Sequence, residues 1–154
     1  MADSTIVVRF FEGARKRVKL NCTYAVGAMV SKAKARCEDL ISARDHTLAD
    51  LRRLGYPYAK RKPANPHDPP VVVHVQNGNL ISGLQQTPPK GNSEGVSASV
   101  INTCEEDVWI QEGTPTMIAR PYMDWVREHY ADQILQAGKD EFLKRGGFTE
   151  EQSA

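Results

Sequence analysis

VSASVINTCEEDVWIQEGTPTMIARPYMDWVREHYADQIL, residues 96–135, carries the strongest structural signals of this 154-residue chain. Apolar residues alternate over 96–100 and again over 108–110, which predicts two strands joined by a polar turn at 105–107. Pro121 suits the first turn of a helix, where its missing N–H costs no hydrogen bond, and apolar residues follow it at helical spacing. The segment therefore predicts a module of two strands and a helix, with no catalytic motif in it.

The N-terminal part of the chain predicts a strand followed by the longest helix. Residues 5–11, TIVVRFF, are β-branched and aromatic, as strand residues often are, and a short apolar segment at 18–20 is expected to return beside them as a hairpin. Over 23–44 apolar residues recur every three or four positions, and Thr23 is placed to cap the start of that helix. Cys37 lies on the apolar stripe, where we expect a small core residue rather than a reactive thiol.

The middle of the chain alternates short elements with loops. A short helix is expected over 47–54, an apolar strand over 71–75 and a brief helix over 79–84. Five of the nine prolines lie in 55–70, which predicts a long, stiffened loop, and the composition of 86–95 predicts a turn or mobile loop.

These elements predict an α+β fold. We expect a small antiparallel sheet packed against a long N-terminal helix and a C-terminal helix, with the long proline-rich loop between them. The length suits a single domain over 1–154, in which 146–154 is a flexible tail after the glycine pair that ends the last helix.

Composition argues against several classes of protein. The net charge of +1 gives no general case for nucleic-acid binding, which usually needs a larger basic excess. Three cysteines without CxxC spacing argue against a disulfide framework and fit a reducing cytosol. No segment has the pattern of a signal peptide or the roughly 20 apolar residues of a membrane span, so we expect a protein made in the cytoplasm without a membrane partner.

The sequence predicts neither an enzyme nor a cofactor, because it contains no Walker loop, GxGxxG, GxSxG or HExxH motif. His67, Asp68 and His74 fit no familiar spacing of metal ligands, so no metal site is expected. Trp109 and Trp125 are expected to be core or interface anchors, since large aromatic side chains dominate both.

Three segments, in the same order, give the chain a family resemblance. EGTPTMIARPYMDWVREHYADQI (112–134) resembles the C-terminal signature of the small neck or tail-completion (tail-component) proteins of tailed bacteriophages. HTLADLRRLGYPYAKR (46–61) and HDPPVVVHVQNGNLISGL (67–84) are similar to upstream parts of that family. The resemblance covers about 23–135 and does not include MADSTIVVRFF at the N-terminus.

The resemblance implies a structural virion protein, a subunit of a closed ring that joins head to tail and has a central opening for DNA. The implied partners are other copies of the chain, head-closure or connector proteins, tail-terminator or tail-tube proteins, and phage DNA in non-specific contact. The implied location is the neck or tail of the virion, with the host cytoplasm as the site of assembly. The residues hypothesised to form the subunit interface are Gly113, Thr114, Arg120, Pro121, Tyr56, Tyr58, Lys60 and Arg61.

Three alternatives stay open at this point. Within the same region of a virion, the chain is also compatible with a tail-terminator subunit. In a different class, the basic runs 15–17, 32–36 and 60–62 would serve a small nucleic-acid-binding regulatory domain, whose binding would fall steeply with salt. A small metal-dependent hydrolase would depend on the His67, Asp68 and His74 set alone.

Overall fold

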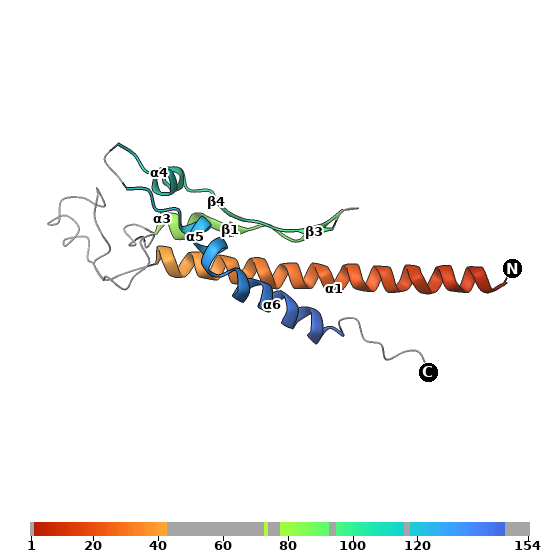
Figure 1. Ribbon diagram of the computed structural model, residues 1–154. Coiled ribbons are helices and arrows are strands. Elements are labelled where there is room, and N and C mark those ends of the chain that lie inside the picture. Colours follow the sequence, from red (N-terminus) through yellow and green to blue (C-terminus); the bar gives the residue numbers. More distant parts are fainter. Residues whose placement is uncertain (1, 43–72, 74–77, 93–94, 116–117, 147–154) are drawn as a thin grey trace. The chain divides into compact units, whose positions relative to one another are not determined.

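The structure is a computed structural model, which describes residues 2–42, 73, 78–92, 95–115 and 118–146 (Figure 1). Helices precede and follow a run of four consecutive strands, which confirms the predicted α+β class. The elements are α1 (Ala2–Ile41), α3 (Asn79–Gly83), β1 (Leu84–Gln86), β2 (Lys90–Gly91), β3 (Val96–Ser97), β4 (Val100–Asn102), α4 (Glu106–Glu112), α5 (Tyr122–His129) and α6 (Ala131–Lys144).

Two compact units share these elements, and each is built from segments distant in the sequence. The first unit comprises Met1–Lys32, Thr87–Ser99 and Asp132–Ala154, and the second comprises Ala33–Gln86 and Val100–Ala131. The single domain expected over 1–154 stays a prediction, and the tail after Gly146 lies outside the described residues.

One long helix stands where the sequence predicted a strand, a hairpin and a helix. α1 includes 5–11 and 18–20, so the predicted hairpin is wrong. Strand preferences amount to less than about 1 kcal/mol per residue, and a helix already nucleated elsewhere extends at little cost. Thr23 lies inside α1 and caps nothing, because its hydroxyl donates to the carbonyl of Lys19 at 2.9 Å, one turn back.

The predicted apolar stripe of this helix is confirmed. In the second unit, Cys37, Leu40 and Ile41 are buried at the C-terminal end of α1. The backbone N–H of Val73, also buried, donates to the Leu40 carbonyl at 2.8 Å, which ties the chain after the proline-rich segment to the end of the helix. The other buried hydrophobic residues of this unit are Leu84, Tyr122 and Val126.

Cys37 is a core residue, as predicted. Burial first, and then the negative groups of Asp107 and Glu38, raise the pKa of its thiol to about 11. Because the thiolate is the reactive form, we expect iodoacetamide at pH 8 to alkylate the partly exposed Cys22 and Cys104 at least tenfold faster than Cys37. Peptide mass spectrometry over time would measure the three rates. Equal rates in the native protein would contradict the prediction, and equal rates in guanidinium serve as its control.

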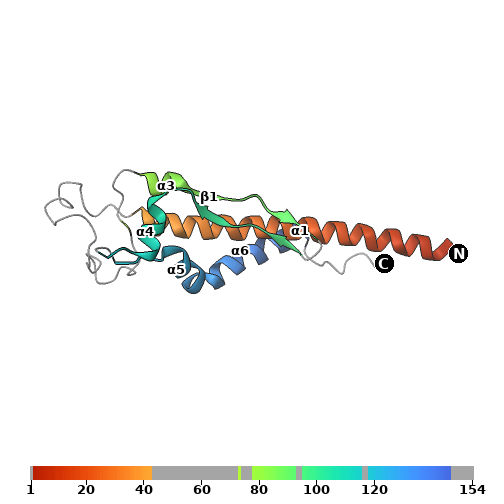
Figure 2. The same cartoon turned by 90° about the horizontal axis from the view of Figure 1, so that it is seen from above.

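The predicted strand over 96–100 is confirmed in part, because it is divided into β3 and β4, which pair in different sheets. In the second unit β1 pairs antiparallel with β4, and Leu84 lies opposite Asn102; both views show them side by side (Figure 1, Figure 2). In the first unit β2 pairs antiparallel with β3, and Lys90 lies opposite Ser97. The sheet component is therefore two small two-stranded sheets.

The turn or loop predicted over 86–95 is confirmed in part. A turn lies between Asn92 and Gly95, but Gln86 ends β1 and Lys90 and Gly91 form β2. The N–H of Asn92 donates to the Gly95 carbonyl at 2.8 Å, and the Gly95 N–H donates to the Asn92 side chain at 2.8 Å. Asn92 and Gly95 thus bound the turn of the β2–β3 hairpin, and before β2 the Thr87 N–H donates to the Ser99 carbonyl at 2.8 Å.

The second predicted strand, over 108–110, is also wrong, and the expected polar turn at 105–107 is the start of helix α4. Glu106 and Asp107 lie in the first turn, where acidic side chains favour a helix. Gly113 ends the helix with φ near 79°, and its N–H donates to the Trp109 carbonyl at 2.9 Å. A three-residue alternation is too short to distinguish a strand from a helix.

The single helix predicted after Pro121 is two helices, because Tyr130 leaves the helical conformation and separates α5 from α6. α5 begins directly after Pro121, and α6 ends just before Gly146, which has a positive φ of 96°. α3 confirms the brief helix expected over 79–84. The helix predicted over 47–54, the loop over 55–70 and the strand over 71–75, apart from Val73, lie outside the described residues.

In the first unit, the hairpin of β2 and β3 and the helix α6 both contact α1. Gly138 of α6 faces Met29 so closely that a Cβ added to it would lie 2.6 Å from the Met29 side chain. The Arg145 guanidinium lies 3.5 Å from the centre of the Tyr24 ring, a cation–π contact. The arrangement matches the prediction that the strands and the C-terminal helix pack on the long N-terminal helix.

Candidate functional site

Helix α4 is packed the opposite way from an ordinary amphipathic helix. α4 belongs to the second unit, and the side that packs against the rest of that unit carries Asp107, which is buried, and Gln111, which is partly buried. Its other side exposes Val108 at 54% and Trp109 at 56%. A helix normally buries its aromatic residues and exposes its carboxylates, so this inversion marks α4 as the candidate functional element.

A buried polar cluster holds the inner side of α4 in place. The Tyr122 hydroxyl donates to one carboxyl oxygen of Asp107 at 2.6 Å, and the Gln111 amide donates to the other at 2.5 Å. Tyr122 is 0% exposed, and its pKa is raised far above its usual range by burial and by the bond to Asp107. The phenol therefore stays neutral and serves as a hydrogen-bond donor, which satisfies a buried acid.

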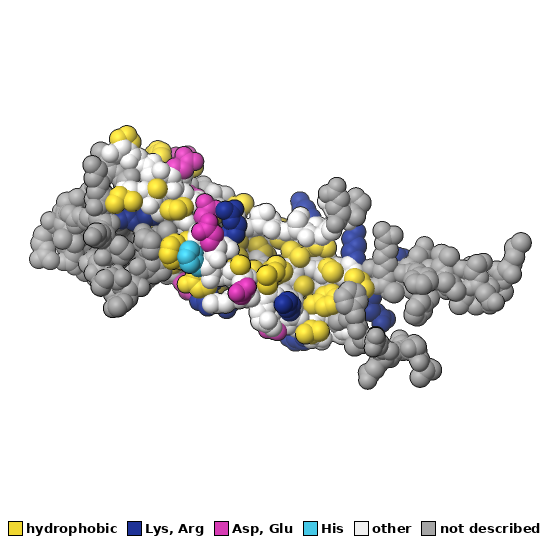
Figure 3. Space-filling model, in the orientation of Figure 1, with side chains coloured by type: hydrophobic (Ala, Val, Ile, Leu, Met, Phe, Trp, Pro, Cys, Tyr) yellow, Lys and Arg dark blue, Asp and Glu magenta, His cyan; other side chains and the backbone are white. Residues whose placement is uncertain are grey.

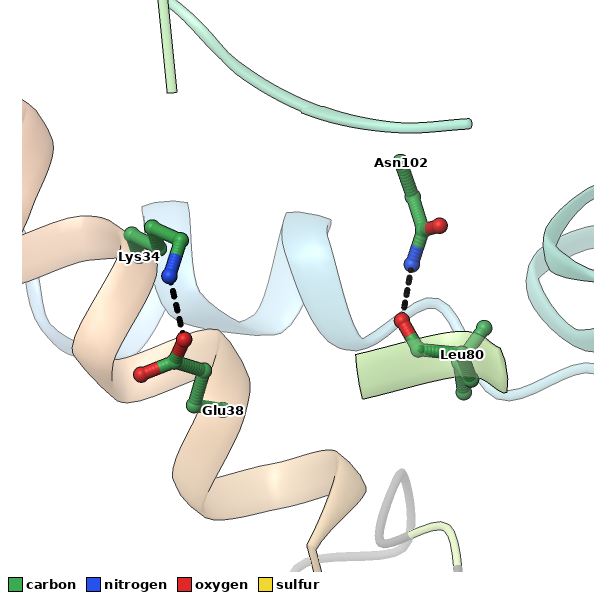
Figure 4. A network of polar contacts seen from close by, with 4 residues as sticks. All are labelled: Lys34, Glu38, Leu80 and Asn102. Atoms are coloured by element: carbon green, nitrogen blue, oxygen red, sulfur yellow. Dashed lines mark hydrogen bonds and ion pairs between the residues drawn. The ribbon is translucent and has the colours of Figure 1, made fainter. Parts of the chain in front are cut away.

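Asn102 extends this cluster to the strands and α3. Its amide nitrogen donates to the Tyr122 hydroxyl at 3.0 Å and to the Leu80 carbonyl at 2.9 Å, and Figure 4 shows the second of these bonds. Its amide oxygen accepts from the backbone N–H of Cys104 at 3.0 Å. Every polar atom of this side chain is bonded, so β4, α3, α5 and the start of α4 are joined at one residue.

The end of α1 in the same unit carries separate surface contacts. Lys34 and Glu38 pair one turn apart, as Figure 4 also shows. The Arg36 guanidinium lies 5.0 Å from the centre of the Tyr130 ring. The first contact lies within α1, and the second joins α1 to the end of α5. Neither of these partly exposed contacts indicates a ligand.

The outer side of α4 forms a continuous surface, which we call the α4 stripe: Glu105, Val108, Trp109 and Glu112. These positions are spaced i, i+3, i+4 and i+7, so they lie on one face of the helix. All four are exposed, and Figure 3 shows hydrophobic and acidic side chains together on the surface that α4 forms. The stripe has an apolar centre and a carboxylate at each end.

Four of the predicted interface residues are described, and they lie between α4 and α5. Gly113 ends α4, Thr114 follows it, and Pro121 precedes α5. Arg120 is only 6% exposed, and its N–H donates to the Ile110 carbonyl at 2.7 Å. The segment joins two helices of the second unit, and its contact with another subunit stays a prediction.

The other four predicted interface residues, Tyr56, Tyr58, Lys60 and Arg61, lie outside the described residues. His67, Asp68 and His74 lie there as well. Sequence reasoning did name Trp109 as an anchor, but it read residues 105–110 as a turn and strand. A helical reading of 105–112 would have placed the four stripe residues on one face.

In the part of the chain that the structure describes, no three His, Cys, Asp or Glu side chains gather in a way that would hold a metal ion. Cys104 lies beside Glu106, with its Sγ 2.7 Å from a carboxylate oxygen, and burial followed by this contact raises the pKa of the thiol. Across the described ranges, no helix has both the length and the apolar character that a membrane crossing requires.

Comparison of the chain with protein-family models, with curated proteins and with solved structures finds no match. The α4 stripe and the buried cluster beneath it are thus interpreted from their own geometry.

Proposed function

We propose that this protein is a structural virion subunit of a tailed bacteriophage, one copy in a ring that joins head to tail around a central passage for DNA. The order of three segments, 46–61, 67–84 and 112–134, supports this, because each resembles the same family of neck and tail-completion proteins. The tail-terminator ring of the same region is the alternative position.

The observation that carries the proposal is the exposure of Trp109 and Val108 beside a buried Asp107. Exposed aromatic and aliphatic side chains on a rigid element are typical of protein–protein interfaces, where tryptophan is strongly enriched among the residues that dominate affinity. The buried cluster with Tyr122 keeps α4 in this orientation. A protein that works by binding other subunits needs such a surface.

A closed ring needs a heterologous interface, in which one patch of each copy contacts a different patch of the next. The proposed partners are other copies of the chain, head-closure or connector proteins, and tail-terminator or tail-tube proteins. The proposed contact with DNA in the passage is non-specific. The proposal includes no cofactor and no catalysed reaction, and it places the protein in the virion after assembly in the host cytoplasm.

Electron microscopy of lysates from a parent phage with this reading frame disabled tests the proposal. Filled heads and complete tails lying apart are expected. Intact, infectious particles would overturn it. Salt-sensitive binding of the purified protein to plain duplex would then favour the regulatory-domain alternative.

Trp109→Ala is expected to leave the protein folded and to lower its incorporation into virions at least about tenfold, because truncating an aromatic anchor commonly costs an interface 2 kcal/mol or more. Immunoblotting of purified particles measures the incorporation. Leu143→Ala is a matched control, since Leu143 is 69% exposed on α6 and lies outside the α4 stripe. Normal incorporation of Trp109→Ala would contradict the assignment of the stripe.

A further inference from the structure

The α4 stripe has a charge pattern that limits what can bind it. Glu105 and Glu112 lie at its two ends, Glu106 lies beside it, and all three are exposed. The pKa of Glu106 is lowered by its contact with Cys104, so this carboxylate is charged at neutral pH. Residues 105–112 contain no lysine or arginine that would neutralise the three acids. An occupant therefore needs apolar or aromatic groups for the centre and cations for the ends.

Residues 56–62 of the same chain, YPYAKRK, have this chemistry. Tyr56 and Tyr58 supply aromatic rings that stack well on an indole, and two prolines, at 57 and 63, limit the backbone conformations of the segment. Lys60, Arg61 and Lys62 supply three consecutive positive charges, equal in number to the three carboxylates on and beside the stripe. An arginine can also pair with a carboxylate through two parallel hydrogen bonds.

We propose that the α4 stripe of one copy binds residues 56–62 of the neighbouring copy. The inference rests on the proposed ring and names the two patches that its interface needs. Each copy would offer one acidic–aromatic stripe and accept one basic–aromatic segment, so the contact is heterologous and repeats from copy to copy until the ring closes. The apolar centre of the stripe supplies affinity, and its carboxylates set the register.

A charge exchange tests this pairing in the phage. Two double variants would each place like charges opposite one another in every subunit contact. One carries Glu105→Lys and Glu112→Lys on the stripe, and the other carries Lys60→Glu and Arg61→Glu on the basic segment. Each pair supplied in trans to the disabled phage is expected to lower the titre at least about 100-fold relative to the wild-type protein. The chain carrying all four substitutions restores opposite charges and is expected to recover most of the titre.

A cysteine pair distinguishes contact between copies from contact within one chain. Glu112→Cys with Lys60→Cys, oxidised in assembled particles, is expected to give a ladder of covalent multimers on a non-reducing gel. Each single substitution controls for the native cysteines and is expected to give no ladder. A cross-linked monomer without a ladder would overturn the proposal.

Glu128→Lys with Asp132→Lys is the matched control for charge, because both residues are exposed and lie outside α4. It is expected to support a normal titre. Two further results would overturn the pairing, provided that all chains accumulate as folded protein. One is a wild-type titre from both double variants, and the other is a titre that stays low with the chain carrying all four substitutions. Those results leave the role in joining head to tail standing, whereas infectious particles from the disabled phage would remove that role itself.

Discussion

Tyr122→Ala is expected to lower the free energy of unfolding by about 3–5 kcal/mol, because it removes a fully buried aromatic ring and leaves a cavity. The same change leaves Asp107 without its 2.6 Å donor and Asn102 without the hydroxyl that accepts its amide. A buried polar group that loses its partner adds a cost of its own. Urea denaturation followed by tryptophan fluorescence would measure the change.

Two further variants separate the ring from the hydroxyl. Tyr122→Phe keeps the ring and is expected to cost about 1–3 kcal/mol, the penalty for leaving a buried acid short of a donor. Leu143→Ala, at an exposed position, is expected to stay within about 0.5 kcal/mol of the wild-type protein. If Tyr122→Phe were as stable as the wild type, the hydroxyl would have no part in holding α4.

Gly83→Ala is expected to cost about 2–3 kcal/mol, because the new methyl group has no room. Gly83 is buried at the end of α3, and its Cβ would lie 2.9 Å from the backbone nitrogen of Cys104 and closer still to the Asn102 amide oxygen. Neither neighbour can move freely, since the Asn102 side chain is bonded to Leu80, Tyr122 and Cys104. Thermal unfolding by circular dichroism would report the loss.

Gly138→Ala is the informative comparison, because its Cβ would also come within 3 Å of another residue, Met29. The Met29 side chain has several rotatable bonds and can move aside. In a helix interior, alanine is also more favourable than glycine by about 1 kcal/mol. The stability of this variant is expected within about 1 kcal/mol of the wild type. Equal losses from Gly83→Ala and Gly138→Ala would mean that crowding alone, rather than the fixed position of Asn102, sets the cost.

The losses of stability expected from Tyr122→Ala and Gly83→Ala bear on function because both substitutions disturb the buried cluster beneath α4. On its inner side Asp107 accepts from Tyr122 and from Gln111, and Trp109 on its outer side depends on the same helix for its position. Variants that loosen the cluster without unfolding the chain should therefore weaken assembly as Trp109→Ala does. Tyr122→Phe is the mildest such change, and its incorporation into virions can be measured in the same way.

The elements that sequence predicted correctly are those with a local cause. The apolar stripe that includes Cys37 repeats over several helical turns, and repetition of that length has one interpretation. Pro121 predicts the start of α5 because its ring restricts φ to a value that suits the start of a helix. The alternating residues 96–100 include β3 and the start of β4, and each of these strands has a partner close by in the sequence.

The candidate site was less predictable. The family resemblance points to Gly113, Thr114, Arg120 and Pro121, which lie next to α4 rather than on its exposed stripe. Trp109 was identified as an anchor from its residue type alone, yet its exposure depends on the helical twist of 105–112. Residues 56, 58, 60 and 61 lie outside the described residues, so their part in the interface stays a prediction.

By itself, the sequence determined the α+β class, the long helical stripe and the helix after Pro121, because periodicity and backbone restriction act within a few neighbouring residues. Only the tertiary structure decided that 106–112 is a helix and that its Asp107 faces inward while Trp109 faces outward. The reason is energetic: an aspartate is buried only where donors meet it, and its Tyr122 donor lies fifteen residues further along the chain.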